Sequence, residues 1–424
     1  MFNVKAEKNG GGPRILYIVY WGAMEPLGQS LVLPAVKRLS ALGAQLALVT
    51  FEKPADAEKL DEMESIRRSL EDHNIDWTPL VYHKRPKIPA TAFDIIQGWV
   101  QGIKAQLSFK PDIIHARTFI GGLIGLTLAP VIGAKFIYHN EGFYPDEQVD
   151  AGVWQKDSAP HRIALSLERS MYTKAEAIIA MSHRGRNVIA EMSDVKGKDT
   201  PVIVVPSCVD LELFRDRFSD KPESQNGIRL IYAGSVGGRY ILDKIGRFVA
   251  VAQGEEPGTY LSILTRTERS EVESMLAGSG LAENTWSLGS VPYIEMPEQL
   301  SLSHAGLFFL SQGLSEHGCS PTKVGEYWAM GLPVITTPNV SDIDEIILRD
   351  RVGVIIRDHC DDEYRRAFRE LMDLLKDPNL SGRCRRAAES HYALESACVR
   401  QMSLYEDVFF QATRTSGSSE LGKA

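Results

Sequence analysis

The stretch RILYIVYWGAMEPLGQSLVLPAVKRLSALGAQLALVTF, residues 14–51, decides the fold of this chain. It begins with a continuous apolar run, Arg14–Trp21, of the kind found in the central strand of a parallel sheet, where helices cover both faces. A loop follows, and Ser30–Leu42 then predicts a helix that ends at Gly43. A second apolar run, QLALVTF, completes a βαβ unit. This unit predicts a doubly wound α/β domain.

Strand-like runs alternate with helical stretches along the rest of the chain, as expected for parallel sheets that are covered on both faces. A polar segment, DRFSDKPESQNG at residues 216–227, interrupts the pattern once, and the alternation then starts again. We therefore expect two Rossmann-like doubly wound parallel-sheet domains that face each other across a cleft. The further strands are expected at residues 80–83, 112–115, 135–139, 177–181 and 202–205, and then at 228–234, 260–265, 305–310, 333–337 and 352–356.

The pattern divides the chain into five parts. Parallel sheets bind ligands at the carboxyl ends of their strands, so the functional site is expected in the cleft between the two domains. The predicted parts are an N-terminal domain at residues 1–215, a linker at 216–227, a C-terminal domain at 228–395, a helix at 396–412 that returns to the N-terminal domain, and a flexible tail at 413–424.

The composition is that of an ordinary soluble globular protein. Of 424 residues, 44% are hydrophobic and 24% are charged, and these values exclude collagen-like and wholly disordered chains. A net charge of -8 provides no basic face for duplex nucleic acid, so no nucleic-acid partner is expected. Five cysteines without metal-ligand spacing predict reduced thiols in a cytosolic compartment.

No segment predicts export or a membrane span. Residues 1–13 lack an apolar central region. The longest apolar stretch, Thr118–Tyr138, is broken by Pro130, Gly133 and Lys135, and it divides into a helix, a turn and a strand. We therefore expect a cytoplasmic protein. Peripheral contact with the inner face of a membrane stays open, because the sequence contains no strongly basic amphipathic helix.

The segment SEHGCSPTKVGEYWAMGLPVI, residues 315–335, carries the most chemical information. Ser320 is suited to the N-cap of a helix and Pro321 to its first position. Gly331 followed by Pro333 ends this helix before a strand. The start of the helix is therefore expected at the cleft.

A helix start of this kind is suited to binding a diphosphate. Its free backbone N–H groups and the positive end of its dipole attract anions, and Lys323 adds a full charge in the first turn. Glu326 lies one turn further on the same face, where a carboxylate can accept hydrogen bonds from both hydroxyls of a ribose. The alternative is a capped helix with an ordinary pair of Lys323 and Glu326, and composition alone does not separate the two.

The loop PLGQS, residues 26–30, lies between the first strand and its helix, at the ligand-facing edge of such a sheet. Gly28 would allow close contact with a donor phosphate or an acceptor, although a glycine is common there without any ligand. Neither this loop nor GSVGGRY, residues 234–240, matches GxGxxG, which argues against a dinucleotide site.

In their order along the chain, these segments resemble the retaining glycosyltransferases of family 4, which have the GT-B fold of two Rossmann-like domains. The resemblance rests most on SPTKVGEYWAMGLPVI and covers the chain from Arg14 to about Phe410. It implies transfer of a sugar from a nucleoside-diphosphate donor, of the UDP or GDP type, to an acceptor hydroxyl. The anomeric configuration would be retained, and neither a metal nor a cofactor would be essential. The other matching segments are EPLGQSLVLP, DIIHARTF, HNEGFYPDEQVDAGVW, AIIAMSHRG, VVPSCVDLELF and YAGSVGGRYIL.

The resemblance also assigns the second domain to the donor and the first to the acceptor. At the matching positions, Glu326 would bind the ribose. Many family members have a second glutamate eight positions earlier, where this chain has Gly318, and Glu316 lies two residues away from that place. That role is therefore left without a residue. The residues implied to hold the diphosphate are Ser320, Pro321, Thr322 and Lys323.

A second basic ligand of the diphosphate commonly follows the first strand of the second domain in this family, as an arginine directly after a glycine. Here Gly234 is followed by Ser235, and the candidate is Arg239 at the end of SVGGR. Gly237 and Gly238 let the backbone approach a phosphate closely, and a guanidinium can donate two hydrogen bonds to it. The alternative is an ordinary arginine in a turn.

His139 ends a predicted strand, so we expect it to point into the cleft. A histidine near this place approaches the donor sugar in many relatives, and the resemblance makes His139 a catalytic candidate together with Arg239 and Lys323. The alternative is a structural histidine, which is the commoner role of a lone histidine at a strand end.

Polar residues of the first domain are candidates for binding the acceptor. Arg117, Glu141 and Asp146 could bind its hydroxyls, although the acidic run around Asp146 could equally be a solvated loop. In the second domain, the backbone near Val291 and Tyr293 follows a predicted strand and is expected near the donor base.

The stretch Asp342-Ile343-Asp344 has the Asp-x-Asp spacing with which many metal-dependent glycosyltransferases hold a divalent cation. It opens the run IDEIIL, where acidic residues favour a helix start. We therefore expect no metal site there.

The sequence thus predicts a retaining glycosyltransferase that acts on a glycan, a lipid-linked acceptor or another hydroxyl acceptor. Biosynthesis of cell-surface polysaccharide or glycoconjugates is the expected setting. Two alternatives stay open: a GT-B-shaped sugar-nucleotide epimerase, and a bilobed nucleotide-sugar-binding protein without catalysis.

Overall fold

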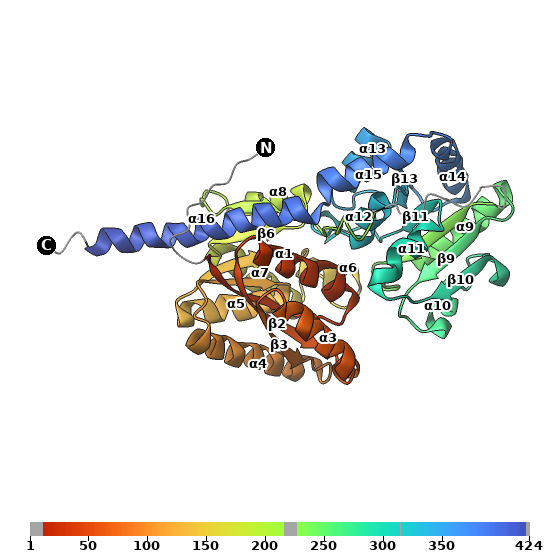
Figure 1. Cartoon of the computed structure of the whole chain (residues 1–424). Coiled ribbons are helices and arrows are strands. Elements are labelled where there is room, and N and C mark those ends of the chain that lie inside the picture. Colours follow the sequence, from red (N-terminus) through yellow and green to blue (C-terminus); the bar gives the residue numbers. More distant parts are fainter. Residues whose placement is uncertain (1–11, 216–226, 314, 421–424) are drawn as a thin grey trace.

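The computed structural model describes residues 12–215, 227–313 and 315–420, so nearly all of the predicted linker lies outside the described residues. Two α/β domains, each built on one parallel sheet, follow one another along the chain (Figure 1). The long helix α16 (Leu394–Glu420) leaves the second domain and runs along the first. The prediction of two Rossmann-like doubly wound parallel-sheet domains is confirmed.

The first domain comprises seven strands and the helices between them. The strands are β1 (Arg14–Val19), β2 (Gln45–Glu52), β3 (Ile75–Val81), β4 (Ile113–Arg117), β5 (Lys135–His139), β6 (Ala177–Ala180) and β7 (Val202–Val204). The helices are the π-helical turn η1 (Gly28–Val32), α1 (Leu33–Ala41), α2 (Pro54–Ala57), α3 (Leu60–Glu71), α4 (Lys87–Ser108), α5 (Phe119–Ile132), α6 (Tyr144–Asp150), α7 (Ala159–Lys174) and α8 (His183–Glu191).

The strand order of this sheet is β3-β2-β1-β4-β5-β6-β7, and its pairings are parallel. The central strand β1 alternates between two cores. Tyr17 and Val19 share one core with α1, α3 and α16, while Leu16 and Ile18 share the other with α5 and α7. Both faces of β1 are buried, which explains why the run is apolar throughout.

The second domain comprises six strands in the order β10-β9-β8-β11-β12-β13, again with parallel pairings. The strands are β8 (Arg229–Ala233), β9 (Tyr260–Leu264), β10 (Trp286–Gly289), β11 (Ala305–Phe308), β12 (Val334–Thr336) and β13 (Gly353–Ile355). The helices are α9 (Leu242–Glu255), α10 (Arg269–Leu276), η3 (Glu283–Thr285), η4 (Tyr293–Glu295), α11 (Met296–Ser301), η5 (Ser315–His317), α12 (Thr322–Ala329), α13 (Ile343–Asp350), α14 (Asp361–Leu375) and α15 (Leu380–His391).

Some element bounds differ from the sequence prediction. The third strand begins at Ile75, ahead of the predicted residues 80–83, because β3 is the edge strand of its sheet. An edge strand is half exposed and tolerates a proline, here Pro79, so it lacks the continuous apolar run of an inner strand. The last helix continues to Glu420, past residue 412, where the sequence predicted its end.

The predicted division of the long apolar stretch is confirmed. It forms helix α5, a left-handed turn at Gly133 with φ of 70°, and strand β5. Among the helices that the structure describes, none is both long and apolar enough to cross a membrane.

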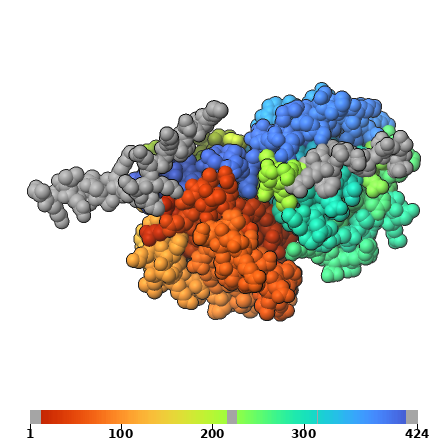
Figure 2. Space-filling view, in the orientation of Figure 1, coloured from red at the N-terminus to blue at the C-terminus, as the bar shows by residue number. Residues whose placement is uncertain are grey.

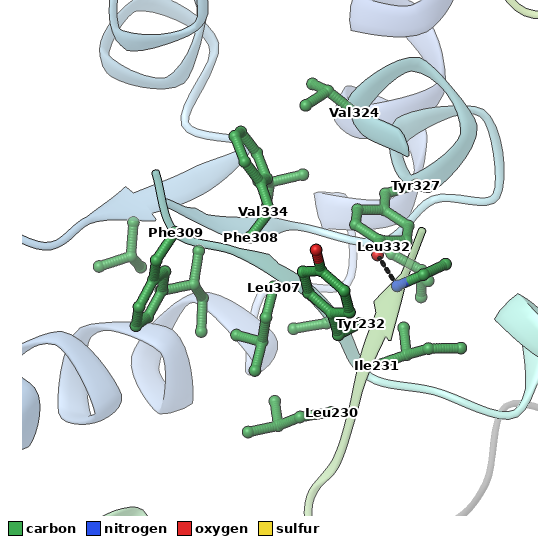
Figure 3. Close-up of a cluster of buried hydrophobic side chains, with 14 of the residues drawn as sticks. Leu230, Ile231, Tyr232, Leu307, Phe308, Phe309, Val324, Tyr327, Leu332 and Val334 are labelled. Carbon is green, nitrogen blue, oxygen red and sulfur yellow. Dashed lines mark hydrogen bonds between the residues drawn. The ribbon is translucent and has the colours of Figure 1, made fainter. Parts of the chain in front are cut away.

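Tyr327 of α12 connects this helix to the sheet of the second domain. Its ring lies over Gly306 of β11, where an added Cβ would be 2.1 Å from a ring carbon. Its hydroxyl accepts a hydrogen bond of 2.9 Å from the backbone N–H of Ala233, at the end of β8 (Figure 3). The start of α12 and the loop after β8 are therefore held in fixed relation.

Tyr327→Phe should destabilise the second domain, because the buried N–H of Ala233 would lose its acceptor. We expect the free energy of unfolding, measured with denaturant, to fall by about 1 to 3 kcal/mol. Tyr260→Phe makes the same change on the half-buried strand β9 and serves as the control. Equal losses in the two variants would contradict a specific role for the Tyr327 hydroxyl.

Candidate functional site

A cavity of about 380 Å³ lies between the two domains, at the carboxyl ends of both sheets. The domains pack closely against each other, as the space-filling view shows from one side (Figure 2). The first domain contributes Tyr20, Trp21, Leu27, Leu31, Thr118, Phe119, Ile120, Glu141, Gly142, Tyr144, Glu147, Met181 and Ser207 to its walls. The second domain contributes Arg239, Tyr240, Leu310, Cys319, Ser320, Pro321 and Thr322.

The structure brings only part of the predicted site to the wall of this cavity. Glu141, Arg239, Ser320, Pro321 and Thr322 line it directly. In the described part of the chain, the other predicted residues lie outside its lining: Gly28, Arg117, His139, Asp146, Gly237, Gly238, Val291, Tyr293, Lys323 and Glu326.

The start of α12 differs by one residue from the prediction. Pro321, not Ser320, is the N-cap, and the helix begins at Thr322. The Ser320 hydroxyl accepts a hydrogen bond of 3.0 Å from the backbone N–H of Ser207 in the first domain, so it connects the domains and does not cap the helix. No side chain caps this helix start, whose N–H groups therefore stay available at the cavity.

Lys323 lies behind this helix start in an aromatic cage. Its side chain is buried, and Nζ is 4.0 Å from the ring centroid of Tyr240, 4.6 Å from that of Tyr232 and 6.0 Å from that of Phe308. Nζ has no hydrogen-bond partner within residues 12–215, 227–313 and 315–420. Burial lowers the pKa of Lys323 to about 7, against an opposing effect of Glu326.

Glu326 is buried one turn further along α12. Burial raises its pKa to about 7, while Lys323 and a hydrogen bond with Tyr293 act in the opposite direction. Tyr293 thus contacts Glu326, the residue predicted to bind the ribose. The ring centroids of Tyr293 and Phe214 lie 5.5 Å apart. Both side chains are buried. Glu326 has Tyr293 as a partner, whereas Lys323 Nζ has none among the described residues.

Lys323→Met should stabilise the free protein and weaken the binding of UDP. Because burial lowers the pKa of Lys323 from 10.5 to about 7, the folded state disfavours the ammonium form, and this cost is largest below pH 7 and absent above pH 10.5. We expect a gain of roughly 2 to 5 kcal/mol at mildly acidic pH, since one pKa unit corresponds to about 1.4 kcal/mol.

The UDP affinity of the same variant should fall by a factor of roughly ten to a hundred, which is the value of a charge-assisted hydrogen bond. Thermal unfolding at several pH values and titration calorimetry measure the two effects. Lys376→Met, at an exposed lysine of the second domain, is the control. A variant that binds UDP as tightly as the parent would remove Lys323 from the site.

A glycine turn positions Arg239. Gly237 and Gly238 have φ values of 81° and 61°, in the left-handed region that favours glycine, and Tyr240 N–H bonds back to the Gly237 carbonyl at 3.1 Å. The Arg239 carbonyl accepts from the N–H of Ser311, which fixes the turn to the end of β11. The turn thus presents the guanidinium to the cavity. The Arg239 side chain is one fifth exposed.

The Arg239 guanidinium pairs with carboxylates of both domains. It lies 3.3 Å from Glu147 Oε1 of the first domain and 3.4 Å from Glu316 Oε1 of the second. Burial raises the pKa of Glu147, and Arg239 acts against this rise. Asp150, next to these groups, accepts a hydrogen bond of 2.6 Å from the Ser315 hydroxyl. The buried Glu316 therefore belongs to the site through Arg239.

Asp342, the first aspartate of the Asp-x-Asp stretch, caps a helix of the other domain. Its two carboxylate oxygens accept hydrogen bonds of 2.7 and 3.0 Å from the backbone N–H groups of His183 and Arg184, at the start of α8. Asp344 accepts from the N–H of Asn339 at 2.7 Å. The two carboxylates thus serve different backbone groups.

Three predicted residues have packing roles. Gly28 is buried, and an added Cβ would lie 2.1 Å from the carbonyl oxygen of Gly22, so this glycine allows the loop after β1 to fold tightly. Asp146 lies 3.6 Å from His161 of α7 and not at the cavity, where its neighbour Glu147 stands instead. Val291 packs against the core of the second domain.

His139 belongs to a buried hydrogen-bond chain that begins on α16. Gln401 donates to the Tyr405 hydroxyl at 2.6 Å, which lies 2.7 Å from His115 Nδ1. His115 Nε2 lies 3.1 Å from His139 Nδ1. The two histidines and Tyr405 are buried, and burial, assisted by the Arg117 charge, holds the pKa of both histidines well below 6.5.

The polarity of this chain determines the tautomer of His139. In one polarity of the chain, the Tyr405 hydroxyl accepts from Gln401 and donates its proton to Nδ1 of His115, and this is the polarity that we propose. Neutral His115 then carries its proton on Nε2 and donates it to His139 Nδ1. His139 consequently carries its proton on Nε2, which lies 3.7 Å from Glu141 Oε1 and has no hydrogen-bond partner among the described residues. His139 is thus a neutral donor.

Glu141 connects this donor to the cavity. Its Oε1 accepts a hydrogen bond from Nε of Arg117, whose guanidinium lies 3.5 Å from the Tyr17 hydroxyl and 5.5 Å from the ring centroid of Trp21. Burial raises the pKa of Glu141, and Arg117 acts against this rise. Of the predicted acceptor-binding residues, Glu141 alone faces the cavity, and Arg117 supports it from behind.

In Tyr405→Phe, the proton of His139 should no longer be confined to one ring nitrogen, because His115 Nδ1 loses its donor. Long-range ¹⁵N–¹H NMR spectra of the histidines measure the proton position directly. We expect His139 to change from Nε2-protonated to a mixture, and stability to fall by about 1 to 3 kcal/mol. An unchanged His139 spectrum in this variant would contradict the proposed polarity.

Several residues of the site escaped sequence analysis. Tyr232 and Tyr240 come from one segment around the end of β8 and Phe308 from the end of β11, and only the fold brings the three rings around one amine. Tyr405 is far from His115 in sequence and gives no local signal. Trp21, by contrast, directly follows the first strand, and this position could have marked it as a cleft residue.

Comparisons with known proteins agree with this architecture. The profile of the family described as Glycosyltransferase Family 4 matches residues 30–213. The curated D-inositol 3-phosphate glycosyltransferase of Pseudarthrobacter chlorophenolicus is 20% identical over 318 residues, which are 71% of this chain and 72% of the relative.

Solved structures are similar over almost the whole chain. Sucrose-phosphate synthase from Thermosynechococcus elongatus has a TM-score of 0.68 at 14% identity and covers 94% of this chain and 100% of its own. Anabaena Alr3699/HepE, solved in complex with UDP and glucose, has a TM-score of 0.64 at 14% identity and covers 92% of this chain and 99% of its own. At such identities the likeness concerns the fold.

Proposed function

We propose that the chain is a GT-B glycosyltransferase of the family 4 type, which transfers a sugar from a UDP- or GDP-linked donor to an acceptor hydroxyl with retention of the anomeric configuration. The acceptor is a glycan, a lipid-linked acceptor or another hydroxyl acceptor, and the reaction takes place in the cytoplasm or at the inner face of a membrane. It serves the biosynthesis of cell-surface polysaccharide or glycoconjugates.

The observation that carries the proposal is the unpartnered cation at the uncapped start of α12. Among the residues that the structure describes, buried Lys323 has no acceptor, and the N–H groups of Thr322 and its neighbours have no capping side chain. Arg239 lies across the same wall of the cavity. A diphosphate satisfies all three kinds of donor at once, and a neutral ligand does not.

In this reaction the protein stabilises the charge that develops on the departing diphosphate. Arg239, Lys323 and the α12 N–H groups are fixed by packing before the reaction, so little reorganisation is needed. The role that we propose for Glu326, which contacts Tyr293, is to accept hydrogen bonds from the ribose hydroxyls. The acceptor hydroxyl attacks from the face that the diphosphate leaves, and no protein nucleophile takes part.

The acceptor occupies the first-domain side of the cavity. Tyr20, Trp21, Phe119 and Tyr144 form an aromatic wall there, which suits the apolar faces of a sugar ring. Glu141 accepts a hydrogen bond from an acceptor hydroxyl, and its charge is balanced by Arg117 behind it.

Arg239→Gln should lower kcat about a hundredfold, because removal of one preorganised donor costs about 3 kcal/mol in the barrier. Initial rates with a panel of UDP- and GDP-sugars and a hydroxyl acceptor measure this effect, and NMR of the first product identifies its anomer. Arg229→Gln, at the opposite end of β8, is the control. An inverted product would overturn the retaining mechanism, and an unchanged kcat would remove Arg239 from it.

Transfer should persist in the presence of a metal chelator. Within the described residues, no group of three or more His, Cys, Asp or Glu side chains is arranged to hold a metal ion. The positive charge at the diphosphate comes from Lys323 and Arg239 instead. Loss of activity in EDTA that added Mg²⁺ restores would contradict this part of the proposal.

A further inference from the structure

The outer face of α4 is apolar. Ile88, Phe93, Ile96, Val100 and Leu107 are 82%, 51%, 58%, 45% and 78% exposed, and the last four follow one another at helical spacing along a single stripe. A helix on the surface of a domain ordinarily presents polar side chains to solvent. A continuous apolar stripe of this kind marks a contact surface.

The opposite face of α4 is already occupied by its own domain. Gly98 and Gly102 lie against α5, where an added Cβ would be 2.7 Å from Ile124 and 2.0 Å from Leu128. The helix is therefore seated with its apolar stripe outward. Figure 1 shows α4 at the outer edge of the first domain, away from the second domain and from α16.

The segment that contains α4, residues 77–111, is strongly basic. Between residues 77 and 111 the only acidic side chain is Asp94, which is fully buried. The rest of the chain has the opposite balance, since the whole protein carries a net charge of -8. This segment is thus a local cationic surface on an anionic protein. Its exposed basic residues are Lys84, Arg85, Lys87, Lys104 and Lys110.

Asp94 connects this surface to the wall of the cavity. One carboxylate oxygen lies 2.6 Å from His83 Nδ1, and the other accepts from the His83 backbone N–H at 3.0 Å. The second oxygen also accepts a hydrogen bond of 2.6 Å from the Tyr20 hydroxyl, and Tyr20 lines the cavity. The basic loop, the apolar helix and the aromatic wall are therefore one rigid unit.

We infer that this surface docks on an anionic lipid bilayer. It is called the α4 face here and consists of Lys84, Arg85 and Lys87 with the exposed apolar side chains Ile88, Phe93, Ile96, Val100 and Leu107. Apolar side chains enter the headgroup boundary, while the basic residues meet anionic headgroups.

A second copy of the chain fits this surface less well. In a two-fold symmetric contact the same patch meets itself, so basic residues at both ends of α4 would face one another with no exposed acidic residue between residues 77 and 111 to balance them. The inference extends the proposed function and rests on it in one respect: a first domain held on a bilayer favours an acceptor that is itself borne by the membrane.

Cosedimentation of the full chain with vesicles tests the docking without any catalysis. One set of vesicles contains phosphatidylcholine alone, and the other contains equal parts of phosphatidylcholine and phosphatidylglycerol. We expect binding to the anionic vesicles, little binding to the neutral ones, and release at high salt.

Two variants separate the contributions of charge and of apolar contact. K84Q/R85Q/K87Q should weaken partitioning about a hundredfold, since each basic residue near an anionic surface contributes about 1 kcal/mol. F93Q/I96Q should weaken it on neutral and anionic vesicles alike. Because these side chains are exposed, both variants should keep the parent's Tm.

Matched controls carry the same changes elsewhere. Leu348→Gln alters a leucine of the second domain that is 70% exposed. K376Q/R386Q/R400Q removes three exposed basic residues, one directly after α14, one in α15 and one in α16. Both controls should bind vesicles like the parent. A parent protein that ignores anionic vesicles, or α4 variants that bind like the parent, would overturn the inference.

Two further measurements distinguish the other outcomes. A parent dimer in sedimentation velocity that F93Q/I96Q abolishes, without vesicle binding, would assign the α4 face to a second copy and overturn the inference. The thermal shift caused by UDP is measured on the same samples. Vesicle binding without a UDP shift would contradict the proposed function and support the docking surface. A UDP shift without vesicle binding would support the proposed function and overturn the docking inference.

Discussion

A buried amine that its own protein does not satisfy is the constraint on which this site depends. Lys323 is held among the rings of Tyr232, Tyr240 and Phe308, which attract a cation but accept no strong hydrogen bond. Its burial costs free energy until an anion arrives. The uncapped start of α12 adds N–H donors to the same place. The free energy of folding lost by burying Lys323 is consistent with a binding site that is preorganised for a doubly charged leaving group.

The two domains meet through polar contacts that surround this seat. Ser207 bonds to Ser320 beside the start of α12, and Asp342 caps α8 of the first domain. Glu147 of the first domain pairs with Arg239 of the second. Polar contacts of this kind depend on geometry, so a small change in the angle between the domains alters several at once. The cavity between the domains and the contacts that join them are therefore coupled.

The last helix contributes to the chemistry of the first domain. α16 packs on the same core as α1 and brings Tyr405 against His115. Through His115 it sets the proton position of His139, two residues before Glu141 at the cavity wall. A segment at the far end of the chain thus determines whether a buried imidazole donates or accepts. Buried polar chains specify one arrangement because each unsatisfied member costs energy.

The sequence by itself determined the two domains, their parallel sheets and the place of α12, because buried strands need apolar runs and helix ends need glycine and proline. It also placed Glu141 and Arg239, which follow strands β5 and β8, at the ligand-facing edge, and both line the cavity. Only the tertiary structure decided which side chains surround Lys323, that Ser320 connects the domains, and which nitrogen of His139 carries the proton. Those features arise from contacts between residues distant in sequence, and local periodicity carries no information about such contacts.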